Sequence, residues 1–320
     1  MNYIVLDLEW NQSAKGKKYA LGSMPFEIIQ IGAVKLDEHF QVIDEFDRII
    51  RPQIYPQLHA KCSEVTGITQ EMLLKGEHFV DAASDFFTWC GQDYIFCTWG
   101  STDLVELQRN INHYGMEIHL AMPLLFYDVQ KLYSLCFLNG KDRPALQTAI
   151  EDMGIQEKEQ YHMALSDARY TVQIMQNLDF QKVKPFYSID TYRVPKSRKE
   201  EITMNFGNYS KYISRTFDTR ERAANDREVR SCRCFLCGKP MTRTIKWFAT
   251  NGKSYYGLFT CEEHGLMKGR FRTKHTDDDQ YFVIKILKRT DEAGAEKIRQ
   301  RQIREREHRR QKRLNKTDNL

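Results

Sequence analysis

The chain has 320 residues, of which 41% are hydrophobic and 28% are charged, and its formal net charge is +5. This length is enough for one full hydrophobic core together with a second, smaller unit. No apolar run is long enough to cross a bilayer and no signal peptide precedes the first predicted strand. The sequence therefore argues against a membrane-bound or secreted protein and predicts a cytoplasmic one.

The first predicted strand, residues 3–10, contains two carboxylates. Its apolar residues indicate a buried strand, and the two-residue period of a strand places Asp7 and Glu9 on one face. Buried charges are unfavourable unless they are paired or bind a metal. The two carboxylates therefore indicate a metal site, with the alternative that both lie at a solvated strand end.

A third acidic candidate, Asp103, lies where a second buried strand gives way to a helix. Residues 94–99 are predicted as the strand, Gly100 belongs to the turn, and the helix begins near Ser101. Serine, threonine and aspartate suit the start of a helix, so a capping role alone explains Asp103.

A histidine and an aspartate mark the start of a further predicted helix, near residues 163–177. His162 precedes or opens this helix, and Asp167 lies about a turn and a half along it, facing the same general region. One rigid element would then supply a carboxylate for a metal and an imidazole for a water. A lone histidine in this position is otherwise a surface or capping residue.

These motifs together resemble the DEDD exonuclease superfamily, histidine subtype (DEDDh), over about residues 1–180. The likeness follows from Asp7-Leu-Glu9, Trp99-Gly-x-x-Asp103 and His162-x-Ala-x-x-Asp167, in this order. Residues 27–34 look like the second strand of the family, and residues 65–69 look like its recurring loop. The nearest likeness is to the KapD-like and RNA-interference-enhancing exoribonuclease branch, in which a Trp-Gly pair precedes the acidic residue, and this favours RNA over DNA.

The resemblance implies an α/β fold of the RNase H-like type, with a central mixed sheet flanked by helices. The pattern of the chain is compatible with such a layered arrangement. Strands are predicted at residues 3–10, 27–36, 42–50, 94–99 and 126–129, and helices near residues 81–90, 102–114, 144–153 and 163–177.

The resemblance also implies a metal-dependent 3′–5′ exonuclease that releases 5′-mononucleotides from the 3′ end of RNA, and also of single-stranded DNA. Two Mg²⁺ or Mn²⁺ ions suit the oxygen ligands. By this likeness, Asp7, Glu9 and Asp167 hold the ion that activates water. Asp7 and Asp103 hold the ion near the leaving oxygen, and His162 accepts the water proton. The candidate substrate contacts are Trp10, Asn11 and Trp99, although many family members have a smaller or hydroxyl residue near the first two positions.

The two halves of the chain differ in charge. Residues 1–183 contain 15 Lys and Arg against 25 Asp and Glu, a net of −10, which leaves +15 for residues 184–320. A basic half is the expected footprint of a phosphate-backbone partner. The alternative is ordinary solubilising charge.

The basic half contains two knuckles, Cys234-Phe-Leu-Cys237-Gly and Cys261-Glu-Glu-His264-Gly. Strand formers at residues 244–250 and 253–260 lie between them, joined by the hairpin signal Asn251-Gly252. A hairpin would bring the knuckles together, so the pattern predicts a zinc ribbon with a closed, structural Cys3His site. Reduced residues, a redox pair, or Cys232 as a substitute ligand are the alternatives.

The predicted domain order starts with an exonuclease domain at residues 1–183 and a charged linker at residues 184–230. A zinc-ribbon-like nucleic-acid-binding domain follows at residues 231–290, with a third strand at residues 280–287. A basic helical tail at residues 291–320 lies along RNA or is simply solvated.

Two other functions stay open. One is a DNA-directed 3′–5′ exonuclease. The other is a zinc-dependent, RNA-anchoring protein whose nuclease domain is vestigial, although all five chemical positions are intact.

Overall fold

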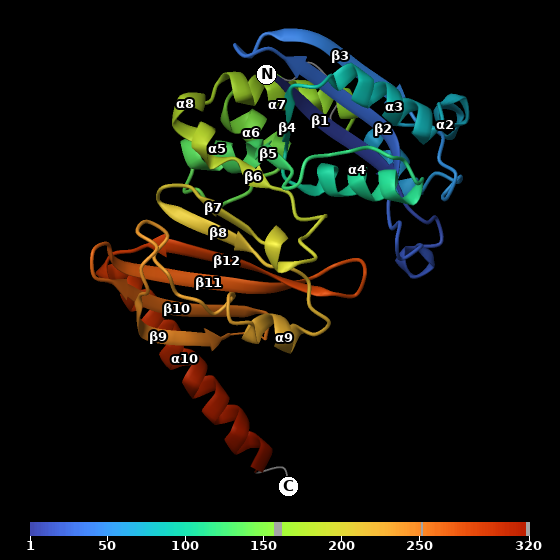
Figure 1. Cartoon of the computed structure of the whole chain (residues 1–320). Helices are drawn as coiled ribbons and strands as arrows, with labels where there is room; N and C mark the ends of the chain where they lie inside the picture. The colour runs from blue at the N-terminus through green and yellow to red at the C-terminus, as the bar shows by residue number, and fades with distance from the viewer. Residues whose placement is uncertain (157–161, 251, 318–320) are drawn as a thin grey trace. The chain divides into compact units, whose positions relative to one another are not determined.

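A computed structural model describes residues 1–156, 162–250 and 252–317. The chain divides into two compact units, Met1–Arg193 and Val194–Leu320 (Figure 1). Within the described ranges, no helix is both long enough and apolar enough to span a membrane.

The first unit contains a mixed sheet in the order β3-β2-β1-β4-β5-β6. β1 pairs antiparallel with β2 and parallel with β4, so it lies in the middle of the sheet. The strands are β1 (Asn2–Asn11), β2 (Glu27–Leu36), β3 (Val42–Ile49), β4 (Tyr94–Thr98), β5 (Leu125–Asp128) and β6 (Ser188–Ile189). The mixed sheet that the resemblance implied is confirmed.

Helices cover both faces of this sheet because successive residues of β1 point to opposite sides. Tyr3 and Val5 belong to a core cluster with residues of α5 and α7, whereas Ile4 and Leu6 belong to a cluster with residues of α3 and α4. The helices are α1 (Ala60–Thr66), α2 (Gln70–Lys75), α3 (Phe79–Cys90), α4 (Thr102–His113), α5 (Val129–Phe137), α6 (Leu146–Asp152), α7 (Ala164–Gln176) and α8 (Phe180–Val183), with short 3-10 turns η1 (Lys17–Tyr19) and η2 (Lys184–Phe186). The RNase H-like arrangement of a sheet between helices is therefore confirmed.

Gly32 lets α7 approach the sheet closely. A Cβ atom at this position would lie 2.1 Å from the backbone nitrogen of Leu165 and 2.2 Å from the carbonyl carbon of Ala164. Because Gly32 is opposite Asp7 in the β1–β2 ladder, the first turn of α7 lies beside the acidic end of β1.

The second unit is a six-stranded antiparallel sheet in the order β7-β8-β12-β11-β10-β9. Its strands are β7 (Ile202–Asn205), β8 (Tyr209–Ile213), β9 (Thr242–Ala249), β10 (Ser254–Cys261), β11 (Gly265–His275) and β12 (Tyr281–Arg289). Its helices are η3 (Arg198–Glu200), α9 (Arg220–Asn225) and α10 (Glu292–Thr317).

The predicted hairpin in this unit is present as β9 and β10, although Asn251 of its turn lies outside the described residues. The predicted third strand corresponds to β12. A further strand that was not predicted, β11, lies between β10 and β12. The sheet is therefore larger than the expected ribbon, because strands from the supposed linker also join it.

The prediction of a linker at residues 184–230 is wrong. β8 pairs with β12, and Tyr212 and Ile213 are buried there. The first unit also extends past the predicted boundary, because β6 pairs with β5 and Arg193 donates to the backbone of Leu120. Because the segment is highly charged, its composition gives no sign of the few apolar residues that pack it against the two sheets.

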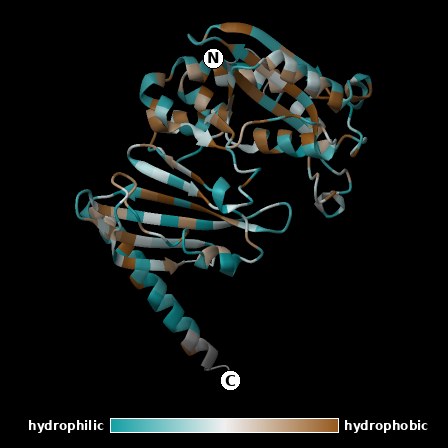
Figure 2. Cartoon of the chain, viewed as in Figure 1, coloured by the Kyte–Doolittle hydropathy of each residue, from teal (hydrophilic) through white to brown (hydrophobic). Residues whose placement is uncertain are grey.

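The predicted basic helical tail forms a helix, α10, and residues 318–320 lie outside the described part of the chain. Its first turns bury Ala295 and Ile298 against Ile245 and Leu258. Beyond them the helix is mostly hydrophilic (Figure 2).

Candidate active site

Two carboxylates of the site come from the central strand, β1. Asp7 and Glu9 continue the series begun by Tyr3 and Val5, so they lie on the face that α7 covers. Ligand atoms of Glu9, His162 and Asp167 lie within 4.8 Å of one another. The strand period thus predicted the shared face correctly.

Asp103 reaches this cluster from the start of α4. It lies in the first turn of that helix, is only 6% exposed, and its carboxylate is hydrogen-bonded to the backbone of Leu8. β4, which leads to this helix, runs parallel to β1. The parallel pairing therefore brings a helix start next to the acidic end of β1.

Both residues of the third motif flank the start of α7. Asp167 is buried in the first turn, and the backbone N–H of His162 donates to its Oδ2 atom at 3.2 Å. The backbone of His162 has a left-handed conformation, with φ 63°, and His162 is exposed to solvent. This conformation is uncommon outside glycine, although histidine adopts it more readily than most residues. It turns the chain immediately before the helix, next to Glu9 and Asp167.

The acidic groups perturb one another strongly. Burial, followed by repulsion from Asp103, Asp167 and Glu9, raises the pKa of Asp7 well above its ordinary value. Burial and the neighbouring aspartates raise the pKa of Glu9 to about 8. Burial raises the pKa of Asp103 to about 7 and that of Asp167 to about 6. Carboxylates held this close repel one another when charged, and a divalent cation between them would remove this repulsion.

The side chains present fit divalent cations. The Oδ1 atom of Asp167 is buried and has no hydrogen-bond partner among the described residues. A buried carboxylate oxygen without a partner is unfavourable unless a cation binds it. The oxygen-rich donor set suits Mg²⁺ or Mn²⁺.

The three predicted substrate contacts differ in their surroundings. Asn11 is fully buried and donates to the carbonyls of Tyr55 and Gln57, so the prediction that it contacts substrate is wrong. Trp10 is partly buried, with its ring centroid 5.8 Å from that of Phe26. Trp99 donates through Nε1 to the carbonyl of Pro144. Both tryptophans remain predicted contacts.

Gln30 of β2 is a further residue of the site that was not predicted. Its Oε1 atom accepts a hydrogen bond from the backbone N–H of Ala164 at 3.1 Å, and its Nε2 atom donates to Asp47 at 2.8 Å. Gln30 thus satisfies one of the unpaired N–H groups at the start of α7. A polar residue within the apolar run of β2 was the available signal.

In the second unit, the four predicted zinc ligands also meet. Ligand atoms of Cys234, Cys237, Cys261 and His264 lie within 4.8 Å of one another. Cys237 Sγ is 3.7 Å from Cys261 Sγ, and His264 Nδ1 is 3.7 Å from the sulfurs of Cys234 and Cys261. Cys232 is outside this cluster, and its thiol donates to the carbonyl of Arg230.

The first unit therefore defines a class of protein with an RNase H-like sheet that presents a carboxylate cluster suited to divalent cations, with a histidine beside it. Residues 4–175 match the sequence model of the Exonuclease family (RNase_T), and the chain belongs to this family.

Three curated relatives show the range of the similarity. The chain is 24% identical to 3′-5′ exoribonuclease 1 of Mus musculus, over 47% of each protein. It is 27% identical to the probable 3′-5′ exonuclease KapD of Bacillus subtilis, over 52% of this chain and 78% of that one. It is 26% identical to the PolC-type DNA polymerase III of Thermotoga maritima, over 66% of this chain and 16% of that one. The chain thus spans about half the length of the mouse relative.

Proposed function

We propose that this protein is a 3′–5′ exonuclease that shortens RNA from its 3′ end and releases 5′-mononucleotides. The observation that supports this most strongly is the cluster of Asp7, Glu9, Asp103 and Asp167 with His162 beside it. All five residues of the motifs are intact, which argues against a vestigial nuclease.

In this proposal Asp7, Glu9 and Asp167 would hold one Mg²⁺ or Mn²⁺ ion, and Asp7 with Asp103 would hold a second. When bound, such a pair offsets the charge that develops on the attacking and leaving oxygens of a phosphodiester. The carboxylates lie on a central strand and at the starts of two helices. Because these elements are rigid, the carboxylates are held in place before substrate binds.

His162 accepts the proton of the attacking water. Histidine is the side chain that most often transfers a proton at catalytic sites. The side chain of His162 is exposed, so water and a strand end can reach the imidazole. Asp167 fixes the backbone of His162 through the hydrogen bond to its N–H group.

RNA is the proposed substrate because the mouse relative is an exoribonuclease by name and the chain has the Trp-Gly pair before Asp103. The similarity to a PolC-type DNA polymerase makes single-stranded DNA the second candidate. The basic second unit provides the positive charge for binding a phosphate backbone.

The experiment is to incubate the whole chain with 5′-labelled single-stranded RNA and a matched DNA, with Mg²⁺ or Mn²⁺ and with chelator. We expect a metal-dependent ladder that shortens from the 3′ end, with RNA degraded faster than DNA. Asp7→Asn abolishes this ladder. Asp85→Asn, which removes an exposed charge on α3, leaves it unchanged. Tight binding without cleavage would instead support the RNA-anchoring function.

We also propose a structural Zn²⁺ site made of Cys234, Cys237, Cys261 and His264. Two sulfur ligands of a tetrahedral zinc lie about 3.8 Å apart, since each Zn–S bond is about 2.3 Å long. The sulfur–sulfur distance of 3.7 Å between Cys237 and Cys261 agrees with this geometry. We expect one zinc per chain by elemental analysis and its loss in Cys261→Ser, whereas Cys232→Ser retains it.

A further inference from the structure

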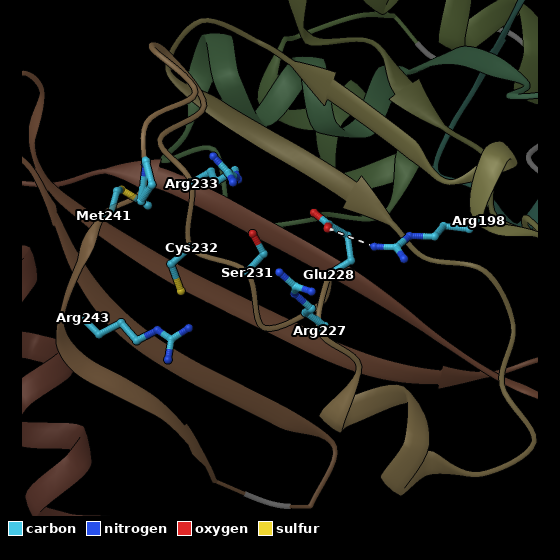
Figure 3. A pocket seen from close by; sticks show the side chains of 9 residues that line it. Arg198, Arg227, Glu228, Ser231, Cys232, Arg233, Met241 and Arg243 are labelled. Atoms are coloured by element: carbon cyan, nitrogen blue, oxygen red, sulfur yellow. Dashed lines mark ion pairs between the residues drawn. The ribbon is translucent and has the colours of Figure 1, made fainter.

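A cavity of about 420 Å³ lies in the second unit, and its lining is rich in arginine. Figure 3 shows Arg198, Arg227, Arg233 and Arg243 around it, together with Cys232. The guanidinium groups come from η3, from the segment after α9, from the residue before the first knuckle and from β9. Residues far apart in the sequence therefore place like charges around one hollow.

The lining has a clear excess of positive charge. Glu228 is the single acid among the lining residues, against four arginines. Its carboxylate is 3.8 Å from Arg198, and both side chains are substantially exposed, at 42% and 68%. Arg227, Arg233 and Arg243 are also exposed. Four guanidinium groups around one cavity repel one another, and an anion between them removes this repulsion.

The wall of the cavity is fixed by buried contacts. Lys285 is only 6% exposed, and its Nζ atom donates to the carbonyls of Glu228 at 2.8 Å and Ser231 at 3.2 Å. Asp226 accepts hydrogen bonds from the backbone N–H groups of Glu228 and Val229. The segment between α9 and the first knuckle is thus held in place before any ligand binds, which lowers the entropy lost on binding.

Arginine matches phosphate particularly well. Its planar guanidinium offers two parallel N–H donors to two phosphate oxygens and stays charged at every physiological pH. A volume of this size is in the range of small-ligand pockets, about 300–1,000 Å³, so it has room for a phosphate with its attached sugar. The size of the cavity favours a phosphate group with its attached sugar over a simple halide.

We propose that the cavity lined by Arg198, Arg227, Arg233 and Arg243 binds a phosphate group of the nucleic acid on which the protein acts. This rests on the proposed function, and it assigns the contact to residues distinct from the carboxylates of the first unit. The phosphate belongs to a phosphodiester within the strand or to a 5′-mononucleotide, and the two sources can be separated by experiment.

The test uses the whole chain in chelator, so that binding is measured without cleavage. Fluorescence anisotropy gives the Kd of a labelled single-stranded RNA over a range of salt concentrations. We expect Arg227→Gln/Arg243→Gln to weaken binding about tenfold and to reduce the slope of log K against log salt by about one to two, because each lost phosphate contact on a single strand removes about 0.7.

The matched control is Arg272→Gln/Lys288→Gln, which removes two exposed positive charges outside the lining. This control should change the Kd for RNA by less than Arg227→Gln/Arg243→Gln does, with little change in the slope of log K against log salt. Arg227→Lys/Arg243→Lys keeps the charge but loses the paired donors, and we expect an intermediate Kd. Thermal unfolding and zinc content, equal in all variants, exclude a general folding defect.

Calorimetry with a 5′-mononucleotide and with inorganic phosphate identifies the source. If the unaltered chain binds the mononucleotide and Arg227→Gln/Arg243→Gln does not, the cavity binds a free phosphate monoester. If this variant weakens only the binding of RNA, the cavity binds a phosphodiester within the strand. Equal behaviour of the pocket and control variants in all titrations would overturn the proposal. Cleavage assays test the proposed function separately, because the chain can cleave RNA without this phosphate contact and can make the contact without cleaving RNA.

Discussion

At the residue scale, the carboxylate cluster depends on two residues of β2 that carry no charge. Gly32 is opposite Asp7 and leaves room for the backbone of α7, and Gln30 caps the N–H group of Ala164. Together they determine how far α7 lies from β1. The position of Asp167 and His162 follows from that distance.

Gly32→Ala should therefore disrupt the first unit. The added methyl would overlap backbone atoms of Leu165 and Ala164, which cannot rotate away, so we expect destabilisation of at least about 1–3 kcal/mol. Nuclease activity should fall with it. Thermal unfolding and the RNA ladder assay provide the measurements. Gly22→Ala is the control, because no atom lies within 4 Å of its added Cβ. Equal stability of the two variants would contradict this account.

The second residue-scale prediction concerns His162. We expect His162→Asn to lower kcat about 10²–10⁴-fold, the typical contribution of a general base, with RNA affinity unchanged. Asparagine is chosen because it tolerates the left-handed backbone at φ 63°. Single-turnover cleavage and anisotropy separate the two effects. His119→Asn, an exposed histidine of the same unit, should cleave normally. A kcat within a few-fold of the unaltered chain would exclude His162 as the base.

At the element scale, α7 is attached to the sheet at three places. Gly32 and Gln30 of β2 contact its first turn, and Arg169 forms a two-pronged ion pair with Glu45 of β3, with Nε 2.9 Å and Nη2 2.5 Å from the carboxylate oxygens. The hydrogen bond from Arg169 lowers the pKa of Glu45. The ion pair thus links the helix that bears Asp167 to the edge strand of the sheet.

Glu45→Gln should destabilise the first unit in a pH-dependent way. Because the pKa of Glu45 is lower in the folded state, its stabilisation is present above its unfolded pKa and is lost as pH falls through the folded value. Both side chains are about one-third exposed, so we expect roughly 0.2–1 kcal/mol at pH about 7 and a difference that shrinks as pH falls below the ordinary pKa of glutamate. Chemical unfolding at several pH values measures this. Glu64→Gln, an exposed acid of α1, should show no such dependence.

At the scale of the whole molecule, two units of opposite charge share one chain. The hydrophobic clusters that include Tyr3, Ile4 and Ile29 contain only residues of the first unit. The first unit therefore has the core that independent folding requires. The excess positive charge is concentrated in the second unit, as expected for a part that recruits a polyanion.

Truncation after Arg193 tests this division. We expect residues 1–193 to fold and to cleave short oligonucleotides with an unchanged kcat. Their affinity for long single-stranded RNA should fall at least about tenfold, with a smaller dependence on salt. Anisotropy and the ladder assay measure both quantities. Undiminished binding of long RNA by the truncated chain would contradict the recruiting role of the second unit.

The sequence by itself determined the elements whose signals are local. The alternation in residues 3–10 placed Asp7 and Glu9 on one face, and the C-x2-C and C-x2-H spacings identified the cysteine and histidine cluster. The family motifs identified the remaining acidic residues and His162. Local periodicity and short motifs can be recognised without knowledge of the fold, because they depend only on residues that are close together along the chain.

Only the tertiary structure decided what depends on contacts between distant residues. β8 was concealed in a charged segment because it pairs with β12, about 70 residues further along, and β7 joins the sheet only through β8. Asn11, a predicted substrate contact, is buried and donates hydrogen bonds to the backbone carbonyls of Tyr55 and Gln57. The arginine cavity and the close approach at Gly32 likewise arise where separate segments meet, and such packing leaves no periodic pattern in the sequence.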